Sequence, residues 1–158
     1  MKTLDLKKDL KYLYSPSAKA VELVTVPPLQ FAMIDGAIEK GSEPGLSPGF
    51  ADAVQALYGV SYTLKFTLKK RVEDPVDYPV MALEGLWWVS DGKWDIEVKD
   101  NLLFTLMILQ PDVVTAELFH QALDELRRKV IEGNAARFGA LRLCRLLCSP
   151  PASTRPTC

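Results

Sequence analysis

One long helical pattern constrains the fold of this chain more than any other feature. Ser47-Pro48 supplies an N-cap and a first-turn proline, and apolar residues then recur at helical spacing to about Lys70. A second stripe on the same predicted helix repeats at every fourth residue and consists of Tyr58, Tyr62 and Phe66. Such a stripe suits either a core position or the wall of a pocket.

An extended segment precedes this helix. Residues 21–34 alternate in polarity, with Val21, Leu23 and Thr25 on one side of the chain. Pro27-Pro28 interrupts the pattern. Because proline cannot donate a hydrogen bond to a central ladder, we expect a bulge or a sheet edge at these two residues.

Two more strands and another helix follow. Residues 78–82 predict a strand that leads into the next segment, residues 102–109 predict a buried strand, and residues 115–133 predict a helix that ends at a glycine. The order strand, helix, strand, strand, helix predicts an α+β fold. We expect one strand-helix-strand-strand module with an additional helix, its antiparallel-rich sheet covered by helices on one face.

A pair of tryptophans beside a carboxylate lies in the segment Leu83-Glu84-Gly85-Leu86-Trp87-Trp88. Strand alternation places Glu84 and Trp88 on one face and Trp87 on the other. An acid near an indole on one strand face suits an apolar or cationic ligand, since aromatic rings attract cations. The alternative is that one indole belongs to the core, the other covers a sheet edge, and the acid is solvated.

Composition excludes several classes of function. The chain has 158 residues, 48% apolar and 25% charged, which fits one globular domain. A net charge of −1 gives no reason to expect nucleic acid or a membrane as partner. The amino terminus lacks the apolar stretch of a signal peptide, and no apolar run has the length of a membrane span. We therefore expect a cytoplasmic location.

The end of the chain differs from the rest. Residues 135–158 contain four arginines and no lysine or acid. All three cysteines, Cys144, Cys148 and Cys158, also lie there, and their odd number argues against a disulfide framework. With one histidine in the chain, at position 120, the ligands are too few for a metal site. A basic amphipathic segment is one interpretation, and a truncated or out-of-frame end is the one we favour. We divide the chain into a domain at 1–134 and an aberrant, poorly ordered tail at 135–158.

Several segments together resemble one known family. They are residues 7–14 (Lys-Lys-Asp-Leu-Lys-Tyr-Leu-Tyr), 31–36 (Phe-Ala-Met-Ile-Asp-Gly), 53–66 (with Ala-Leu-Tyr at 56–58), 83–88 and 107–112. Over about residues 5–132 the chain resembles the gyrase-inhibitor-like (GyrI-like) small-molecule-binding family, related to the effector domains of multidrug-responsive regulators. The resemblance implies two tandem modules around an aromatic, acidic cleft. Here the second module is missing, and Lys40-Gly41-Ser42-Glu43-Pro44-Gly45 replaces a different family loop.

The resemblance also implies a function and a set of site residues. Family members bind bulky apolar or cationic compounds, and some hydrolytically open the cyclopropane ring of DNA-alkylating natural products. By resemblance, Tyr58, Tyr62, Trp87 and Trp88 line the pocket and Glu84 is its acid. Small-molecule binding is our first hypothesis. The second is a hydrolase with Glu84 and Tyr62 as catalytic residues, and the third is a truncated, inactive fragment.

No cofactor is expected under any of these hypotheses. Because a missing module leaves a face uncovered, we also expect two chains to pair as a homodimer through that face.

Overall fold

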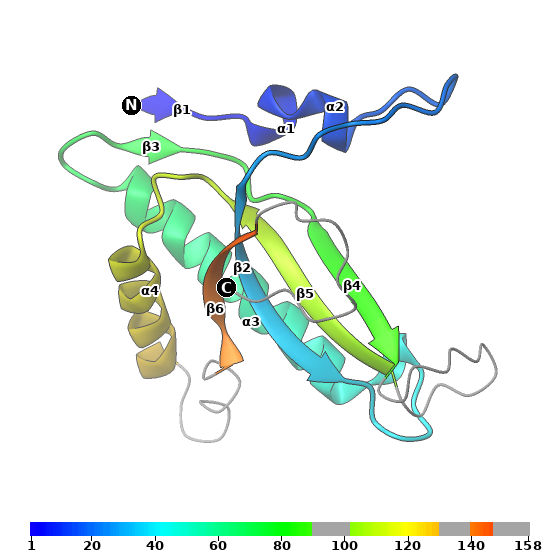
Figure 1. Cartoon of the computed structure of the whole chain (residues 1–158). Helices are drawn as coiled ribbons and strands as arrows, with labels where there is room; N and C mark the ends of the chain where they lie inside the picture. The colour runs from blue at the N-terminus through cyan, green and yellow to red at the C-terminus, as the bar shows by residue number, and fades with distance from the viewer. Residues whose placement is uncertain (90–101, 130–139, 147–158) are drawn as a thin grey trace.

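The computed structural model describes residues 1–89, 102–129 and 140–146 (Figure 1). Four strands form one sheet in the order β4-β5-β2-β6, and each neighbouring pair is antiparallel. These strands are β2 (Leu29–Ala37), β4 (Leu83–Val89), β5 (Leu102–Gln110) and β6 (Arg142–Leu146). A separate parallel pair joins β1 (Lys2–Thr3) to β3 (Val76–Asp77). The described helices are α1 (Leu6–Asp9), α2 (Lys11–Tyr14), α3 (Pro48–Lys69), α4 (Ala116–Lys129) and a 3₁₀ turn at Pro44–Leu46.

The predicted long helix is present as α3, and its start explains why it forms there. The Ser47 hydroxyl accepts a hydrogen bond from the Phe50 amide at 3.2 Å and donates one to the Glu39 carboxylate. The Gly49 amide also donates to Glu39, at 2.8 Å. These contacts satisfy amides that have no partner inside the helix and bring a negative charge to its positive end.

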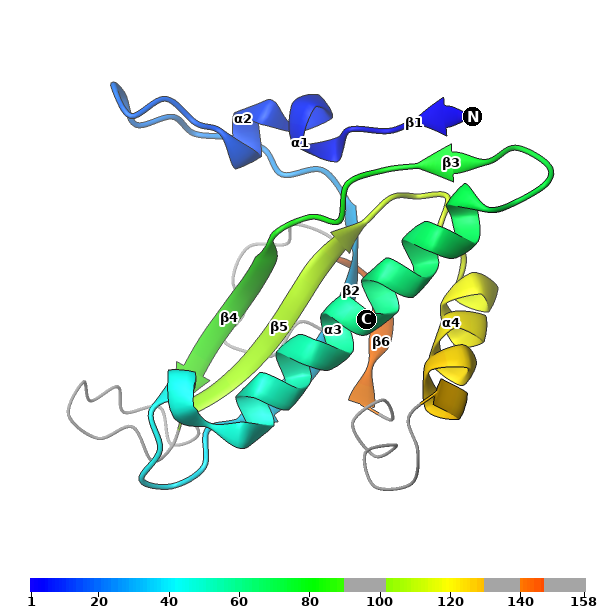
Figure 2. The ribbon, with the colours of Figure 1, turned by 180° about the vertical axis from the view of Figure 1, so that it is seen from behind.

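Helices cover one face of the sheet. On β5, Phe104 packs edge-on against Phe50 of α3, and the Gln110 amide donates to the Ser61 hydroxyl of α3 at 3.0 Å. Figure 2 shows α3 lying along this face with α4 beside it. Leu57, Val60, Leu64 and Leu68 of α3 are fully buried in the resulting core. The predicted α+β fold, with an antiparallel sheet covered by helices on one face, is confirmed.

Several boundaries differ from the prediction. Strand β2 begins only after Pro27-Pro28, because two residues without amide donors end the ladder. Residues 78–82, predicted as strand, form none, and the strand of this region is β4. The last described residue of α4 is Lys129, so its predicted end at residue 133 lies outside the described residues.

The prediction of a poorly ordered segment after Ala135 is wrong for residues 140–146. Strand β6 pairs with β2 in the register Phe31↔Cys144 and Met33↔Arg142. The prediction failed because the composition of this segment gives no sign of its pairing partner β2, which lies more than 100 positions earlier in the chain. Cys144 is buried and disulfide-bonded, an arrangement that the odd cysteine count did not favour. The domain boundary at 134 stays a prediction.

The guanidinium of Arg142 also explains why β6 stays on the sheet. It donates two hydrogen bonds to the Asp35 carboxylate of β2, at 2.8 and 3.1 Å. The Thr105 hydroxyl of β5 donates to the same carboxylate. Asp35 thus joins three strands, and the pairing of charges makes a basic segment compatible with a sheet position.

Among the helices of the described residues, none has the length and apolar character needed to span a membrane.

Candidate functional site

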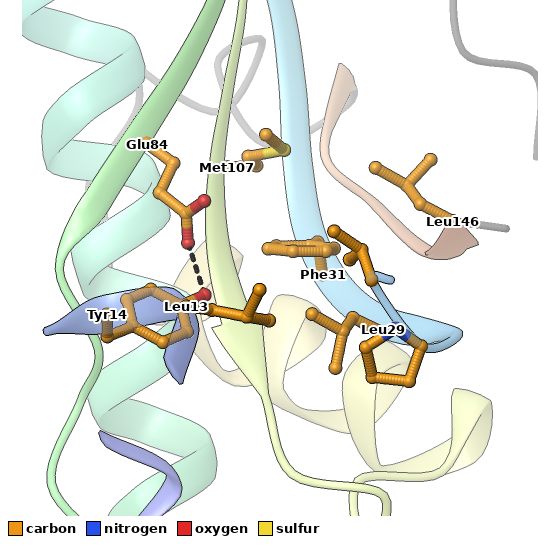
Figure 3. Close-up of a pocket in the computed structure, with 9 residues that line it drawn as sticks. Leu13, Tyr14, Leu29, Phe31, Glu84, Met107 and Leu146 are labelled. Atoms are coloured by element: carbon orange, nitrogen blue, oxygen red, sulfur yellow. Dashed lines mark hydrogen bonds between the residues drawn. The ribbon is translucent and has the colours of Figure 1, made fainter. Parts of the chain in front are cut away.

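A cavity of about 350 Å³ lies against the sheet face that α3 and α4 leave uncovered (Figure 3). All four strands contribute to its floor, through Glu84 of β4, Met107 of β5, Leu29 and Phe31 of β2, and Leu146 of β6. Glu84 is paired with Met107 in the sheet register, so both side chains point to the same face. Its other described lining residues are Leu13, Tyr14, Val26 and Pro27.

Residues before β2 form the opposite wall of this cavity. Helix α2 ends at Tyr14, where the Ser15 amide caps the helix by donating to the Lys11 carbonyl at 2.8 Å. The amino-terminal end of this segment is fixed by β1, whose Lys2 amide donates to the Pro75 carbonyl at 2.8 Å. Tyr14 is therefore held over the sheet at the position where β4 begins.

The Tyr14 hydroxyl donates a hydrogen bond to Glu84 Oε1 at 2.7 Å (Figure 3). Partial burial raises the pKa of Tyr14 above its ordinary value, and the hydrogen bond and charge of Glu84 raise it further. Tyr14 is therefore a neutral donor at physiological pH. Among the described lining residues, Glu84 is the one that carries a formal charge, and apolar side chains surround it.

Strand alternation separates the two tryptophans as predicted. Trp88 is paired with Leu103 and shares the face of Glu84, but it does not line this cavity. Trp87 lies on the helix face, where its ring is 5.7 Å from Phe50 and 5.7 Å from Phe104. The indole of Trp87 and the carboxylate of Glu84 are therefore on opposite sides of the sheet.

Tyr58 and Tyr62 also lie away from the cavity. Both belong to α3, which packs on the other face of the sheet, and Tyr62 is 47% exposed. The structure does not bring Tyr62 and Glu84 together. The proposed ligand and catalytic roles of Tyr58, Tyr62, Trp87 and Trp88 stay predictions, and of the five expected residues only Glu84 lines the cavity.

Sequence reasoning missed Tyr14 as a partner of Glu84. The two residues are 70 positions apart, so no local spacing connects them. By its pattern, the segment that contains Tyr14 is only a short amphipathic piece. The available signal was a tyrosine at the end of that piece, directly before Ser15-Pro16, where a helix must stop.

No metal site is indicated: within the described ranges, no cluster of three His, Cys, Asp or Glu side chains is placed to hold an ion.

Comparisons with known proteins gave matches among solved structures. No protein-family model matches the chain, and no curated protein matches it. An uncharacterized conserved protein from Listeria innocua has a TM-score of 0.74 and 34% identity, over 90% of this chain and 66% of that chain.

Two hydrolases from the same organism also match. The one encoded by lin2189 has a TM-score of 0.71 and 34% identity, over 92% of this chain and 67% of its own. The other has a TM-score of 0.67 and 32% identity, over 90% of this chain and 65% of its own. The chain thus spans about two thirds of the length of the solved chains that it matches.

Proposed function

We propose that this chain, which belongs to the same family as the hydrolase encoded by lin2189 from Listeria innocua, binds a bulky apolar or cationic small molecule in the cavity that contains Glu84. The observation that carries this proposal is the single carboxylate among the described lining residues, most of which are apolar. Glu84 is half-buried, and a cation beside its carboxylate in the cavity would be attracted more strongly than in bulk water.

The dimensions of the cavity agree with this ligand class. A volume of about 350 Å³ lies at the lower end of the range of about 300–1,000 Å³ found for small-molecule sites. Leu29, Phe31, Met107 and Leu146 offer a broad apolar floor, and methionine adapts its shape to different ligands. The Tyr14 hydroxyl binds one carboxylate oxygen of Glu84 and so fixes the position of this side chain. Because the hydroxyl carries no charge, it does not cancel the negative charge of the carboxylate.

Binding of tetraphenylphosphonium, a hydrophobic monocation, tests the proposal. We expect saturable binding by isothermal titration calorimetry, and an affinity about tenfold lower in Glu84→Gln, which keeps the shape of the side chain and removes its charge. Triphenylphosphine oxide, a neutral compound that carries three of the same phenyl rings, should bind both proteins with similar affinity.

The matched control is Glu73→Gln, which removes one exposed acid from a loop outside the cavity. It should bind the cation as the parent does. Equal affinity of Glu84→Gln and the parent for the cation would contradict the proposed role of Glu84. Absence of saturable binding in the parent would favour the third hypothesis, an inactive fragment.

Hydrolysis is the second candidate function, favoured by the two hydrolases among the similar structures. Its proposed substrates are strained electrophiles, such as the cyclopropane ring of DNA-alkylating natural products. Glu84 would position a water molecule and accept its proton as the oxygen attacks a ring carbon. The strained carbon–carbon bond breaks and its electron pair moves to a conjugated carbonyl oxygen of the substrate. That oxygen takes up a proton from a nearby hydroxyl donor, which regains one from the protonated Glu84, so the net change is the addition of one water.

For the donor that protonates the carbonyl oxygen we propose Tyr14 rather than Tyr62, because the Tyr14 hydroxyl already contacts Glu84. A gain of one water in the mass of a cyclopropane-bearing substrate reports turnover. Glu84→Gln should abolish that gain, and Tyr14→Phe should slow it about tenfold or more. A rate unchanged in Glu84→Gln would exclude this mechanism, whereas binding without turnover in the parent would favour the binding function alone.

A further inference from the structure

Two apolar surfaces of the molecule take no part in the cavity. The first is a segment that we call the arm, residues 15–25 between α2 and β2, in which every residue is exposed. Val21 and Leu23 are fully exposed, and one residue, Glu22, separates them in the sequence. In Figures 1 and 2 the arm extends away from the sheet and from the helices. An extended segment with two fully exposed aliphatic side chains gains free energy when another surface covers it.

The second surface is the stripe on α3 formed by Tyr58, Tyr62 and Phe66, which we call the aromatic ladder. Its neighbouring rings are nearly parallel, at 29° and 22°, and their centroids are 6.3 and 6.4 Å apart. Tyr62 and Phe66 are each 47% exposed. The side of α3 that faces the sheet carries the buried residues, so the ladder lies on the outer side of the helix.

The spacing of the two surfaces is the same. In an extended chain each residue advances about 3.3 Å, so side chains at i and i+2 are about 6.6 Å apart on one side. Val21 and Leu23 have this relation, and the ladder presents two furrows about one ring spacing apart. We propose that the arm of one chain docks along the aromatic ladder of a second copy, with Val21 and Leu23 in the two furrows.

This arrangement leaves the charged neighbour of the two aliphatic residues in water. Glu22 lies between Val21 and Leu23, so alternation directs it to the opposite side of the arm. Docking therefore needs no partner for Glu22, in contrast to a contact that would bury the carboxylate. On the ladder side, the Lys70 ammonium lies 5.9 Å from the centre of the Phe66 ring, at the end of the second furrow.

A second copy is the occupant because the arm of each chain leads away from its own α3 in both views. Reciprocal docking around a twofold axis forms two such contacts in each dimer. The homodimer expected from the sequence was to form through a face that a second module would cover, whereas the contact proposed here uses the arm and the ladder. The inference does not depend on the proposed ligand, because neither surface contains a residue of the cavity.

Sedimentation velocity over a dilution series tests the contact. We expect the parent to approach twice the mass of one chain as its concentration rises. The arm variant Val21→Ser/Leu23→Ser and the ladder variant Tyr62→Ala/Phe66→Ala should each remain at the mass of one chain. Leu46→Ser is the matched control, because Leu46 is 79% exposed outside both surfaces, and it should associate as the parent does. Unchanged circular dichroism shows that each variant is folded.

Mixing the two variants separates this model from any other form of association. The arm variant retains its ladder and the ladder variant retains its arm, so a mixed pair keeps one of the two contacts. We expect association in the mixture, weaker than in the parent, although neither variant associates alone.

Three results would overturn the proposal: a parent of single-chain mass at every concentration, variants that associate like the parent, or a mixture that does not associate. The proposal would also fail if the arm variant lost tetraphenylphosphonium binding without any change in association. That result would make the arm a lid over the cavity, whose lining includes Tyr14 and Val26, the two residues that flank the arm.

Discussion

Tyr78 carries a hydroxyl whose burial costs the folded chain free energy. The side chain is 2% exposed, and within residues 1–89, 102–129 and 140–146 its hydroxyl has no hydrogen-bond partner. An unpaired buried hydroxyl costs about 1–3 kcal/mol. We predict that Tyr78→Phe raises the free energy of unfolding by about 1 kcal/mol, measured by urea denaturation. Tyr12→Phe, at an exposed position, should have no effect. A destabilised Tyr78→Phe would show that the hydroxyl has a partner.

Two tyrosines also make stability depend on alkaline pH. Burial raises the pKa of Tyr78, and burial together with the Glu84 carboxylate raises the pKa of Tyr14. An unfolded tyrosine ionises near pH 10, so above this pH the unfolded chain loses protons that the folded chain keeps. The free energy of unfolding must therefore fall as pH rises above about 10. We predict a shallower fall in Tyr14→Phe/Tyr78→Phe, measured by urea denaturation from pH 8 to 11. A slope equal to that of the parent would contradict these pKa shifts.

Glu84 and Tyr14 show how far local patterns predict a site. Strand alternation placed Glu84 and Trp88 on one face and Trp87 on the other, because period-two geometry depends only on sequence neighbours. The contact of Tyr14 with Glu84 depends instead on how the amino-terminal segment lies across the sheet. Likewise, the stripe of Tyr58 and Tyr62 is visible in the sequence, but its spacing alone does not tell a core face from an outer one.

At the scale of single elements, the start of α3 depends on Ser47. Its hydroxyl caps the Phe50 amide and contacts Glu39, and it is almost completely buried. We predict that Ser47→Ala lowers the free energy of unfolding by about 0.5–2 kcal/mol, as for other lost N-caps. Thermal and urea denaturation would both report the loss. The exposed Ser15→Ala is the control and should change stability little; an equal loss in both variants would argue against a specific role of the cap.

Strand β6 depends on the contact of Arg142 with Asp35. Both side chains are about one third exposed, so we discount the pair for screening by solvent and assign it about 1 kcal/mol. We predict that Arg142→Gln speeds amide hydrogen exchange in residues 142–146 about fivefold. Arg145→Gln is the matched control on the same strand, since its partner Asp112 is 80% exposed. Equal exchange rates in parent and Arg142→Gln would mean that backbone pairing alone holds β6.

Elements with strong local signals were predicted well, and elements that depend on distant partners were not. The cap and apolar rows of α3 placed its start correctly, because capping and periodicity are local. Strand β6 could not be predicted, since its stability comes from pairing with β2, more than 100 positions earlier, and from the Asp35 carboxylate. A composition unlike the rest of the chain suggested disorder in a segment that contains an ordered strand.

At the scale of the whole molecule, the cavity connects parts of the chain that otherwise share few contacts. Its described lining comes from α2, from the residues before β2 and from all four strands of the sheet. The amino-terminal segment is held by the pairing of β1 with β3, by the packing of Leu6 and Leu10 against the core, and by the bond from Tyr14 to Glu84. A ligand in the cavity would contact both sides at once and therefore oppose their separation during unfolding.

This coupling predicts a thermal shift. A ligand at one hundred times its dissociation constant stabilises the folded state by about 2.7 kcal/mol, and for a chain of this size about 1 kcal/mol corresponds to 2–4 °C. We predict that tetraphenylphosphonium raises the Tm by about 5–10 °C, measured by circular dichroism, and slows amide exchange in both α2 and β6. At the same ligand concentration, Glu84→Gln should show a smaller shift than Glu73→Gln. Protection confined to the strands, with α2 unchanged, would mean that the ligand binds the sheet without contacting the amino-terminal segment, and would place the site elsewhere than in this cavity.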